Sequence, residues 1–447
     1  MRRIVLLSAL AAVMAVVLAS PAQGAATLTV TTLADEQNNN GSCSLREAII
    51  NANENNQTGS TDCAAGSGDD TITFTVSGQI TLNTSLPQIT DPAGLTISNP
   101  IGPITEAVTI SGNNANTLFF IQGAELTLDN LILSDASSGN GAIFSAVSTL
   151  TITNSIVSGN SGGNAINNQD TLMVTNSIFS GNSGGGAIGN QGTLTVTNST
   201  FSGNSHNDPL GGAQGGAIAS VGTVNVSSTT FTGNSTSGSG GAIHNLGGGS
   251  LTVNNSTFSG NTAPDGRGGG IFCETGSFAG THDTFTNNSG GNLVLENCSL
   301  ELSNTILAND NQGSNCSEPI TDGAYNISDD ASCAFSASTS KNSTNPRVHP
   351  QGLRNNGGPT HTIALLPNSP AIDAIPRAIN GCGTDVETDQ RGLLRPQGPA
   401  CDIGAFEVQK KTPTEPPPDK RSCRKGGWKE FGFKNQGQCI KAVNQAS

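Results

Sequence analysis

Apolar and polar residues alternate in short bursts along the central part of the chain. In "TLTVTNSTFSGN", residues 193–204, Leu194 and Val196 point to one side and the threonines between them to the other. This period of two is typical of a half-buried β-strand. Phe201 marks a second short strand, and Ile218 in "GGAIAS" marks a third, with Gly-Asn steps providing the turns. The pattern therefore predicts three short strands in each burst.

The same burst recurs with 22 residues (Thr149 to Thr171) to 30 residues (Thr193 to Thr223) from one start to the next. Copies begin at Thr149, Thr171, Thr193, Thr223, Ser250, Ser277 and Ser299, with a looser one at Glu125. Three strands in so few residues cannot enclose a core, so each copy must stack on the next. We expect an all-β fold, a right-handed parallel β-helix, with its hand taken from the rule for parallel crossovers.

Stacking explains the repeated letters, because like residues on successive rungs lie about 4.8 Å apart. Five phenylalanines share one register and should form an internal column: Phe179, Phe201, Phe231, Phe258 and Phe285. Asn176, Asn198 and Asn255 share another, where we expect their amides to bond along a ladder. A row of outward threonines could also bind ice or a crystalline surface, but loops of unequal length interrupt the strands.

The open N-terminal end of such a rod needs a cap, and "CSLREAIINAN", residues 43–53, predicts a short helix there. Ser44 followed by Glu47 is a capping box, and the apolar residues between Leu45 and Ala52 fall on one helix face. Arg46 should lie on the outer side in a salt bridge.

The first 25 residues have the charged, apolar and small-residue parts of a secretory signal peptide. The apolar run from Ile4 to Leu18 is shorter than the roughly 18 to 20 residues that span a bilayer. We therefore expect a secreted or cell-surface protein with no integral membrane segment in the mature chain.

Ten cysteines in an exported chain favour disulfides over metal ligands, since no CxxC pair or Cys/His cluster occurs. Spacing does not establish connectivity, and pairing between sequence neighbours is the simplest choice. The expected couples are Cys43 with Cys63, Cys273 with Cys298, Cys316 with Cys333, Cys382 with Cys401, and Cys423 with Cys439.

The net charge of −14 is unevenly distributed. Residues 27–340 contain 24 acidic residues against two basic ones, Arg46 and Arg267, which gives 2 − 24 = −22. Such a body should repel nucleic acid and other polyanions, so no nucleic-acid partner is expected. We expect no cofactor, although the pairs Asp69-Asp70 and Asp329-Asp330 could each touch a structural calcium ion.

The C-terminal tail differs in composition from the rest. A Pro-rich charged spacer precedes a small cysteine-bounded module in which aromatic and basic side chains could grip glycan or anionic polymer. The candidate binding residues are Trp428, Phe431, Arg424, Lys425 and Lys429. A simple terminal cap and a poorly ordered end are the alternatives.

Two stretches carry a family resemblance. "CSLREAI" resembles the signature of CSLREA-domain proteins, which are exported bacterial proteins. "NNGGPTHTIALLPNSPAIDA", "TDQRGLLRP" and "CDIGAFE", within residues 355–407, resemble the choice-of-anchor Q domain that follows β-helix repeats in exported proteins. The FxxN and GGAI repeats are similar to those of polymorphic outer-membrane proteins, which are adhesins and autotransporters. Nothing after Glu407 provides the strands of an autotransporter barrel or an LPxTG-like signal.

The resemblance and the composition together divide the chain into six parts. These are a signal peptide (1–25), a CSLREA-type cap with the first coils (26–110), β-helix repeats (111–310), choice-of-anchor Q-like coils and cap (311–408), a linker (409–421) and a tail module (422–447). Mixed charges between Asp373 and Glu407 predict an ion-pair network that closes the last coil.

An enzyme must also be considered, since pectate lyases and polygalacturonases share the β-helix fold. Lyases of that kind need clustered carboxylates for calcium and a nearby base, and hydrolases need paired carboxylates on neighbouring rungs. The candidate catalytic residues are Asp265, Glu274, His244, His282 and Arg267. Because no spacing repeats as a ligand set would, we favour a non-catalytic role for them.

The hypothesis is an exported interaction or adhesion rod with an unidentified glycan or protein ligand at the cell surface or outside the cell. A polysaccharide lyase or hydrolase is the first alternative, and a self-associating structural component of a surface layer is the second.

Overall fold

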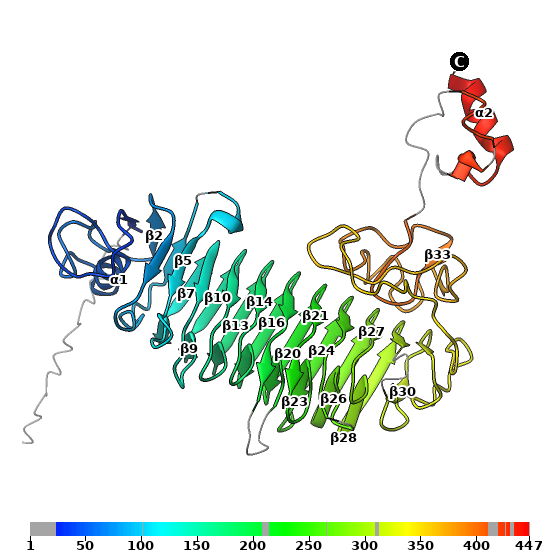
Figure 1. The fold of residues 1–447 in the computed structure, drawn as a ribbon, viewed down its shortest axis with the longest axis horizontal. Coiled ribbons are helices and arrows are strands. Elements are labelled where there is room, and N and C mark those ends of the chain that lie inside the picture. The colour runs from blue at the N-terminus through cyan, green and yellow to red at the C-terminus, as the bar shows by residue number, and fades with distance from the viewer. Residues whose placement is uncertain are drawn as a thin grey trace, which may run out of the picture.

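The computed structural model describes residues 24–100, 102–207, 214–264, 266–308, 313–409, 419–424, 426–429 and 433–446. The main body is an elongated parallel β-helix, with strands stacked along its length (Figure 1). Three columns of strands run along this rod, and within each column every strand pairs in parallel with its counterpart on the next rung.

The first column holds the TLTVT-like strands, with Leu and Val facing inward. It consists of β1 (Thr27–Val30), β2 (Asp70–Phe74), β4 (Leu95–Ser98), β7 (Glu125–Asp129), β10 (Thr149–Thr153), β13 (Thr171–Thr175), β16 (Thr193–Thr197), β20 (Thr223–Ser227), β24 (Ser250–Asn254), β26 (Ile271–Thr281), β28 (Leu293–Ser303) and β30 (Thr321–Asp322).

The second column holds the strands that contain the phenylalanines. It consists of β3 (Gln79–Thr81), β5 (Val108–Ser111), β8 (Leu131–Ser134), β11 (Ile156–Ser158), β14 (Ile178–Ser180), β17 (Thr200–Ser202), β21 (Thr230–Thr232), β25 (Thr257–Ser259), β27 (Thr284–Thr286), β29 (Ile306–Ala308) and β31 (Ile327–Ser328).

The third column contains the strands that follow the GGAI turns. It consists of β6 (Phe119–Gln122), β9 (Ile143–Ala146), β12 (Ile166–Asn168), β15 (Ile188–Asn190), β19 (Ile218–Ser220) and β23 (Ile243–Asn245). It continues in the first residues of β26 and β28, which run on into the first column and join the two columns into one sheet.

The remaining elements are short. β18 (Ser205–His206) pairs in parallel with β22 (Ser235–Thr236), and β32 (Ile375–Pro376) pairs antiparallel with β33 (Ala400–Cys401). The α-helices are α1 (Leu45–Glu54) and α2 (Gln436–Ala446), and the 3-10 helices are η1 (Ile104–Glu106) and η2 (Gly427–Lys429). Among the described residues no helix is both long and apolar enough to cross a bilayer.

The predicted phenylalanine column is confirmed. The rings of Phe179, Phe201 and Phe231 are fully buried and nearly parallel, with centroids 4.8 and 5.0 Å apart. Phe258 and Phe285 continue the stack at 4.7 and 4.6 Å. The centroid separations match the spacing between paired strands, so the core repeats with the backbone.

A buried asparagine ladder lies in a different column from the one predicted, and in the predicted column Nδ2 of Asn176 donates to Oδ1 of Asn154 at 3.4 Å. Asn176, Asn198 and Asn255 sit at corners with positive φ, a conformation that asparagine tolerates better than most residues. The buried ladder uses the last letter of each SGN, TGN or TNN turn: Asn160, Asn182, Asn204, Asn234, Asn261 and Asn288. The backbone N–H of Asn182 donates to Oδ1 of Asn204 at 3.1 Å, and its Nδ2 donates to the same oxygen at 2.8 Å.

The N-terminal cap is confirmed. Helix α1 covers the first coil (Figure 1), with Ser44 as its N-cap and Glu47 completing the capping box. Arg46 forms the predicted salt bridge, through Nε to Oδ1 of Asp35 at 2.8 Å.

All five predicted disulfides are confirmed, and no free cysteine occurs among the described residues. The domain boundaries stay predictions. The signal peptide and most of the linker lie outside the described residues, apart from positions 24–25, 409 and 419–421.

Residues 345–408, here called the flank module, lie beside the rod near β21 and β27 (Figure 1). Oγ1 of Thr230 donates to the carbonyl of His361 at 2.7 Å, and the amide of Ala405 donates to Oγ1 of Thr284 at 3.0 Å. The predicted ion pairs are present, with Arg395 Nη1 3.1 Å from Glu407 Oε2. They hold the module together on the flank of the rod, whereas we expected them to close the last coil.

Candidate functional site

The outer face of the third strand column carries the most varied side chains of the repeat. The residue after each buried isoleucine, or after Phe119 and Leu293 in the same register, points outward, and these residues pair in register from rung to rung. The column reads Phe120, Phe144, Asn167, Gly189, Ala219, His244, Phe272 and Val294. Small side chains in the middle and larger ones at both sides leave this face hollowed.

One end of the hollow is charged. A cavity of about 330 Å³, here called the His244 pocket, is lined by His244, Arg267, Phe272, Glu274, Glu296 and Gln214 among others. Nε2 of His244 lies 3.4 Å from Oε2 of Glu274, and Nη1 of Arg267 lies 3.9 Å from Oε1 of Glu296. Three of the predicted catalytic candidates, His244, Glu274 and Arg267, therefore meet in one place.

His244 is a neutral imidazole at physiological pH. Burial first, and then the positive charge of Arg267 and the proximity of His206, together lower its pKa to about 4. Its contact with Glu274 is therefore not an ion pair at neutral pH. Neither ring nitrogen has a hydrogen-bond partner, although the side chain is only 4% exposed and lines the cavity.

Glu274 and Glu296 occupy the same register on adjacent rungs, between the pairs Cys273–Leu295 and Thr275–Asn297. Paired carboxylates on neighbouring rungs are what a hydrolase requires. Their side chains are, however, 44% and 49% exposed. Both side chains are therefore open to contact from a ligand.

The other two catalytic candidates do not contribute to this geometry. Asp265 lies outside the described residues. His282 is fully buried at a corner with positive φ, in the column position that asparagine holds at Asn255 and Asn304. Burial, and then the charge of Arg395, hold the pKa of His282 well below its ordinary value. His282 is therefore placed as a structural corner residue.

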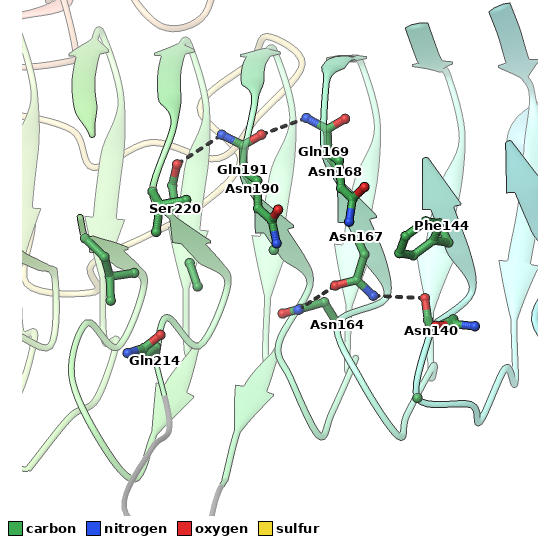
Figure 2. Close-up of a pocket in the computed structure, with 15 residues that line it drawn as sticks. Asn140, Phe144, Asn164, Asn167, Asn168, Gln169, Asn190, Gln191, Gln214 and Ser220 are labelled. Atoms are coloured by element: carbon green, nitrogen blue, oxygen red, sulfur yellow. Dashed lines mark hydrogen bonds between the residues drawn. The ribbon is translucent and has the colours of Figure 1, made fainter. Parts of the chain in front are cut away.

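The other end of the hollow is uncharged. A cavity of about 310 Å³, here called the amide trough, is lined by Asn164, Asn167, Gln169, Gln191 and Gln214, with Phe144 at one end and Ala219 and Val221 at the other. Figure 2 shows these amides projecting over several rungs. Nδ2 of Asn164 donates to Oδ1 of Asn167 at 2.9 Å, and Nδ2 of Asn167 donates to the carbonyl of Asn140 at 2.9 Å.

Gly189 allows these amides to lie close over the strand. A Cβ atom at this position would come within 2.4 Å of Nδ2 and 2.9 Å of Cγ of Asn164. Any larger residue would therefore displace Asn164.

The sequence analysis did not predict the trough residues. Aligning the GGAI copies and comparing the residue after each isoleucine would have revealed this varied column.

No group of three or more His, Cys, Asp or Glu side chains that could hold a metal ion occurs in the described part of the chain. Oδ1 of Asp70 accepts hydrogen bonds from the amides of Ala26 and Ser67, at 3.1 and 2.9 Å. Oδ1 of Asp330 accepts from the hydroxyl and the amide of Ser332, at 2.7 and 3.0 Å. Both carboxylates are thus already engaged by protein donors, and calcium binding by either Asp pair stays a prediction.

The tail module has a small core of its own around the Cys423–Cys439 disulfide. Trp428 packs partly buried against this core together with Phe433, while Arg424 is exposed. Of the other predicted binding residues, Lys425 and Phe431 lie outside the described residues, and Lys429 belongs to η2. Ligand binding by this module stays a prediction.

Comparison with known protein families supports the fold. The family described as "Right handed beta helix region" matches residues 94–258, and the "Chlamydia polymorphic membrane protein (Chlamydia_PMP) repeat" matches residues 255–274. No curated protein matches the chain. A solved structure, "Structure of PL6 family alginate lyase AlyGC", is similar at 10% identity and a TM-score of 0.33, with 78% of this chain and 58% of that chain covered. The present chain thus spans a little over half the length of that enzyme.

Proposed function

We propose that this chain is an exported bacterial protein whose β-helix serves as a surface-associated or extracellular interaction and adhesion rod. The match to the Chlamydia polymorphic membrane protein repeat supports a surface location. The resemblance to CSLREA-domain and choice-of-anchor Q proteins, and the predicted signal peptide in residues 1–25, support export.

The observation that carries the proposal is the length of the hollowed face. The amide trough and the His244 pocket share Gln214 and follow one outward column from Phe144 to Phe272. The paired strands of the third column carry this face. Two adjoining cavities on paired strands suit an extended ligand, because little backbone freedom is lost on binding.

The test combines location with binding. Cells that produce the chain are fractionated, and purified residues 26–447 are screened against glycans, wall polymers and matrix proteins. We expect the chain in the exported or surface fraction and binding without conversion of the ligand. Retention of the chain in the cytoplasm, or no binding to any class, would contradict the proposal.

A polysaccharide lyase or hydrolase is the second candidate, because Glu274 and Glu296 lie in register on adjacent rungs. Its test is product formation from a polysaccharide panel with and without calcium. Turnover that disappears in Glu274→Gln but persists in Glu301→Gln, an exposed carboxylate on β28, would establish this alternative. The absence of product from every substrate supports the non-catalytic rod.

Two further features belong to the proposal. Retention at the surface through residues 422–447 predicts that deleting residues 410–447 shifts the chain from the cell-bound to the soluble fraction.

A purely structural role in a surface layer instead predicts self-association, which sedimentation velocity over a range of protein concentrations would detect.

A further inference from the structure

We propose that the amide trough is a binding subsite for an extended, uncharged glycan. This inference rests on the proposed function and names the ligand class of the rod. The site is the cavity defined above, bordered by Phe144 at one end and Ala219 at the other.

The absence of charged side chains in the trough favours one class of ligand. None of the residues that line it carries an ionisable side chain, and five of them are asparagines and three glutamines. The surrounding body is strongly acidic, with a balance of −22 over residues 27–340. A polyanion would be repelled, and a polycation would find no carboxylate partner in the trough. An uncharged, hydroxyl-rich molecule meets neither penalty.

The hydrogen-bonding groups of the trough match those of a sugar. Each side-chain amide offers two donors and an acceptor oxygen, and each sugar hydroxyl offers one donor and an acceptor oxygen. Oδ1 of Asn164 is buried and has no hydrogen-bond partner, while its Nδ2 is engaged by Asn167. A ligand hydroxyl that reaches Oδ1 of Asn164 removes the cost of leaving this atom unsatisfied.

Apolar surface completes the match. Phe144 is half-buried and stacks on Phe120, with ring centroids 4.9 Å apart and ring planes 16° from parallel. This stacking holds the ring of Phe144 in a fixed position. Val221, 46% exposed, adds apolar surface at the other end. The C–H faces of pyranose rings pack on such surfaces. Because the rungs are spaced by about 4.8 Å, an extended chain of sugars that lies along the trough can contact several successive rungs.

Calorimetric titration of residues 26–447 with β-1,4-linked hexasaccharides of glucose, mannose and N-acetylglucosamine tests the inference. Ala219→Phe fills the trough, and the register accepts the ring, since Phe144 and Phe272 occupy it on other rungs. Thr195→Phe, at an exposed outward position on β16, adds a comparable ring on another face and is the matched control. We expect at least one hexasaccharide to bind wild type, about tenfold or more weakly to Ala219→Phe, and within about twofold to Thr195→Phe.

Two further measurements sharpen the result. Asn167→Ala, on the outward face of β12, should also weaken binding while leaving the melting temperature close to that of wild type. Raising the salt concentration should change the affinity little, because no ion pair is involved. Equal weakening by Ala219→Phe and Thr195→Phe, or tighter binding of an oligogalacturonate than of every neutral hexasaccharide, would overturn the inference.

The outcomes separate this inference from the proposed function. If no neutral hexasaccharide binds but the surface-located chain binds a protein, the glycan subsite is wrong and the interaction rod stands. If no ligand of any class binds and the chain stays inside the cell, both are wrong.

Discussion

The ladder of repeats, residues 125–308, and the flank module both bury many polar groups, but they satisfy them in different ways. In the ladder Asn204 bonds to Asn182 and Asn234, which are copies of itself on the adjacent rungs. In the flank module Gln390 accepts from Oγ1 of Thr257 at 2.6 Å and donates to Oγ1 of Thr230 at 2.9 Å. Thr230 is 160 residues away in the sequence.

This difference predicts two kinds of failure. A defect in the ladder faces intact rungs on both sides, because each repeat contacts only its neighbours. A defect in the flank module removes a contact for which the chain has no second copy. We expect the module to unfold locally while the ladder persists, and the following predictions test that contrast.

The largest effect is expected from Arg395→Met. Glu407 would remain buried without the guanidinium that lies 3.1 Å away, and removing one partner of a buried ion pair costs about 3 to 5 kcal/mol. Hydrogen exchange should show loss of protection in residues 345–408 and retained protection in the ladder. Arg377→Met, which removes an exposed side chain, is the control and should change exchange little. Simultaneous loss of protection in both regions would contradict the contrast.

A smaller effect is expected from Asn204→Ala in the ladder. The change removes the acceptor for the backbone and side-chain N–H groups of Asn182, and leaving buried donors unsatisfied costs about 1 to 3 kcal/mol. Urea unfolding measures the change in free energy. Asn225→Ala, at an exposed outward position on β20, should stay within about 0.5 kcal/mol of wild type. Equal losses in the two variants would show that the ladder bonds contribute nothing specific.

A further prediction concerns a pH dependence in the flank module. Burial, and then the negative charge of Glu407, raise the pKa of Asp402 to about 7, with Arg395 acting in the opposite direction. A carboxyl group whose pKa is higher in the folded state stabilises the fold while it is protonated. Its contribution is complete below about pH 4, the pKa in the unfolded chain, and is lost as the pH rises to about 7.

Asp402→Asn should therefore flatten the fall in the module's stability between pH 5 and pH 8. The readout is the slope with pH, measured by urea unfolding, because the amide also alters hydrogen bonds from Asp373 and Val408. Asp385→Asn, at an exposed position, should leave the slope unchanged. An identical slope in wild type and Asp402→Asn would contradict the raised pKa.

The rungs could be predicted because their signals are local and repeated. The period of two identified each strand, and the recurrence of Phe201 in four other copies identified the internal column. The binding face was harder to foresee. Its outward residues differ from rung to rung, so that Asn167, Gly189 and Ala219 give no repeated letter to recognise. His244, Glu274 and Arg267 were grouped as candidates, but the adjacent amide trough was not.

The sequence by itself determined the strands, the capping box at Ser44 and the disulfide couples, since these depend on residues close together in the chain. Only the tertiary structure decided which asparagine of each repeat turns inward, because that depends on the positive φ at corners such as Asn198. It also decided where the flank module lies, through contacts such as Gln390 with Thr230 that join distant segments. Short-range sequence patterns reflect the local conformation of the backbone. The docking of the flank module and the cavities on the third strand column instead arise only when separate rungs are brought together.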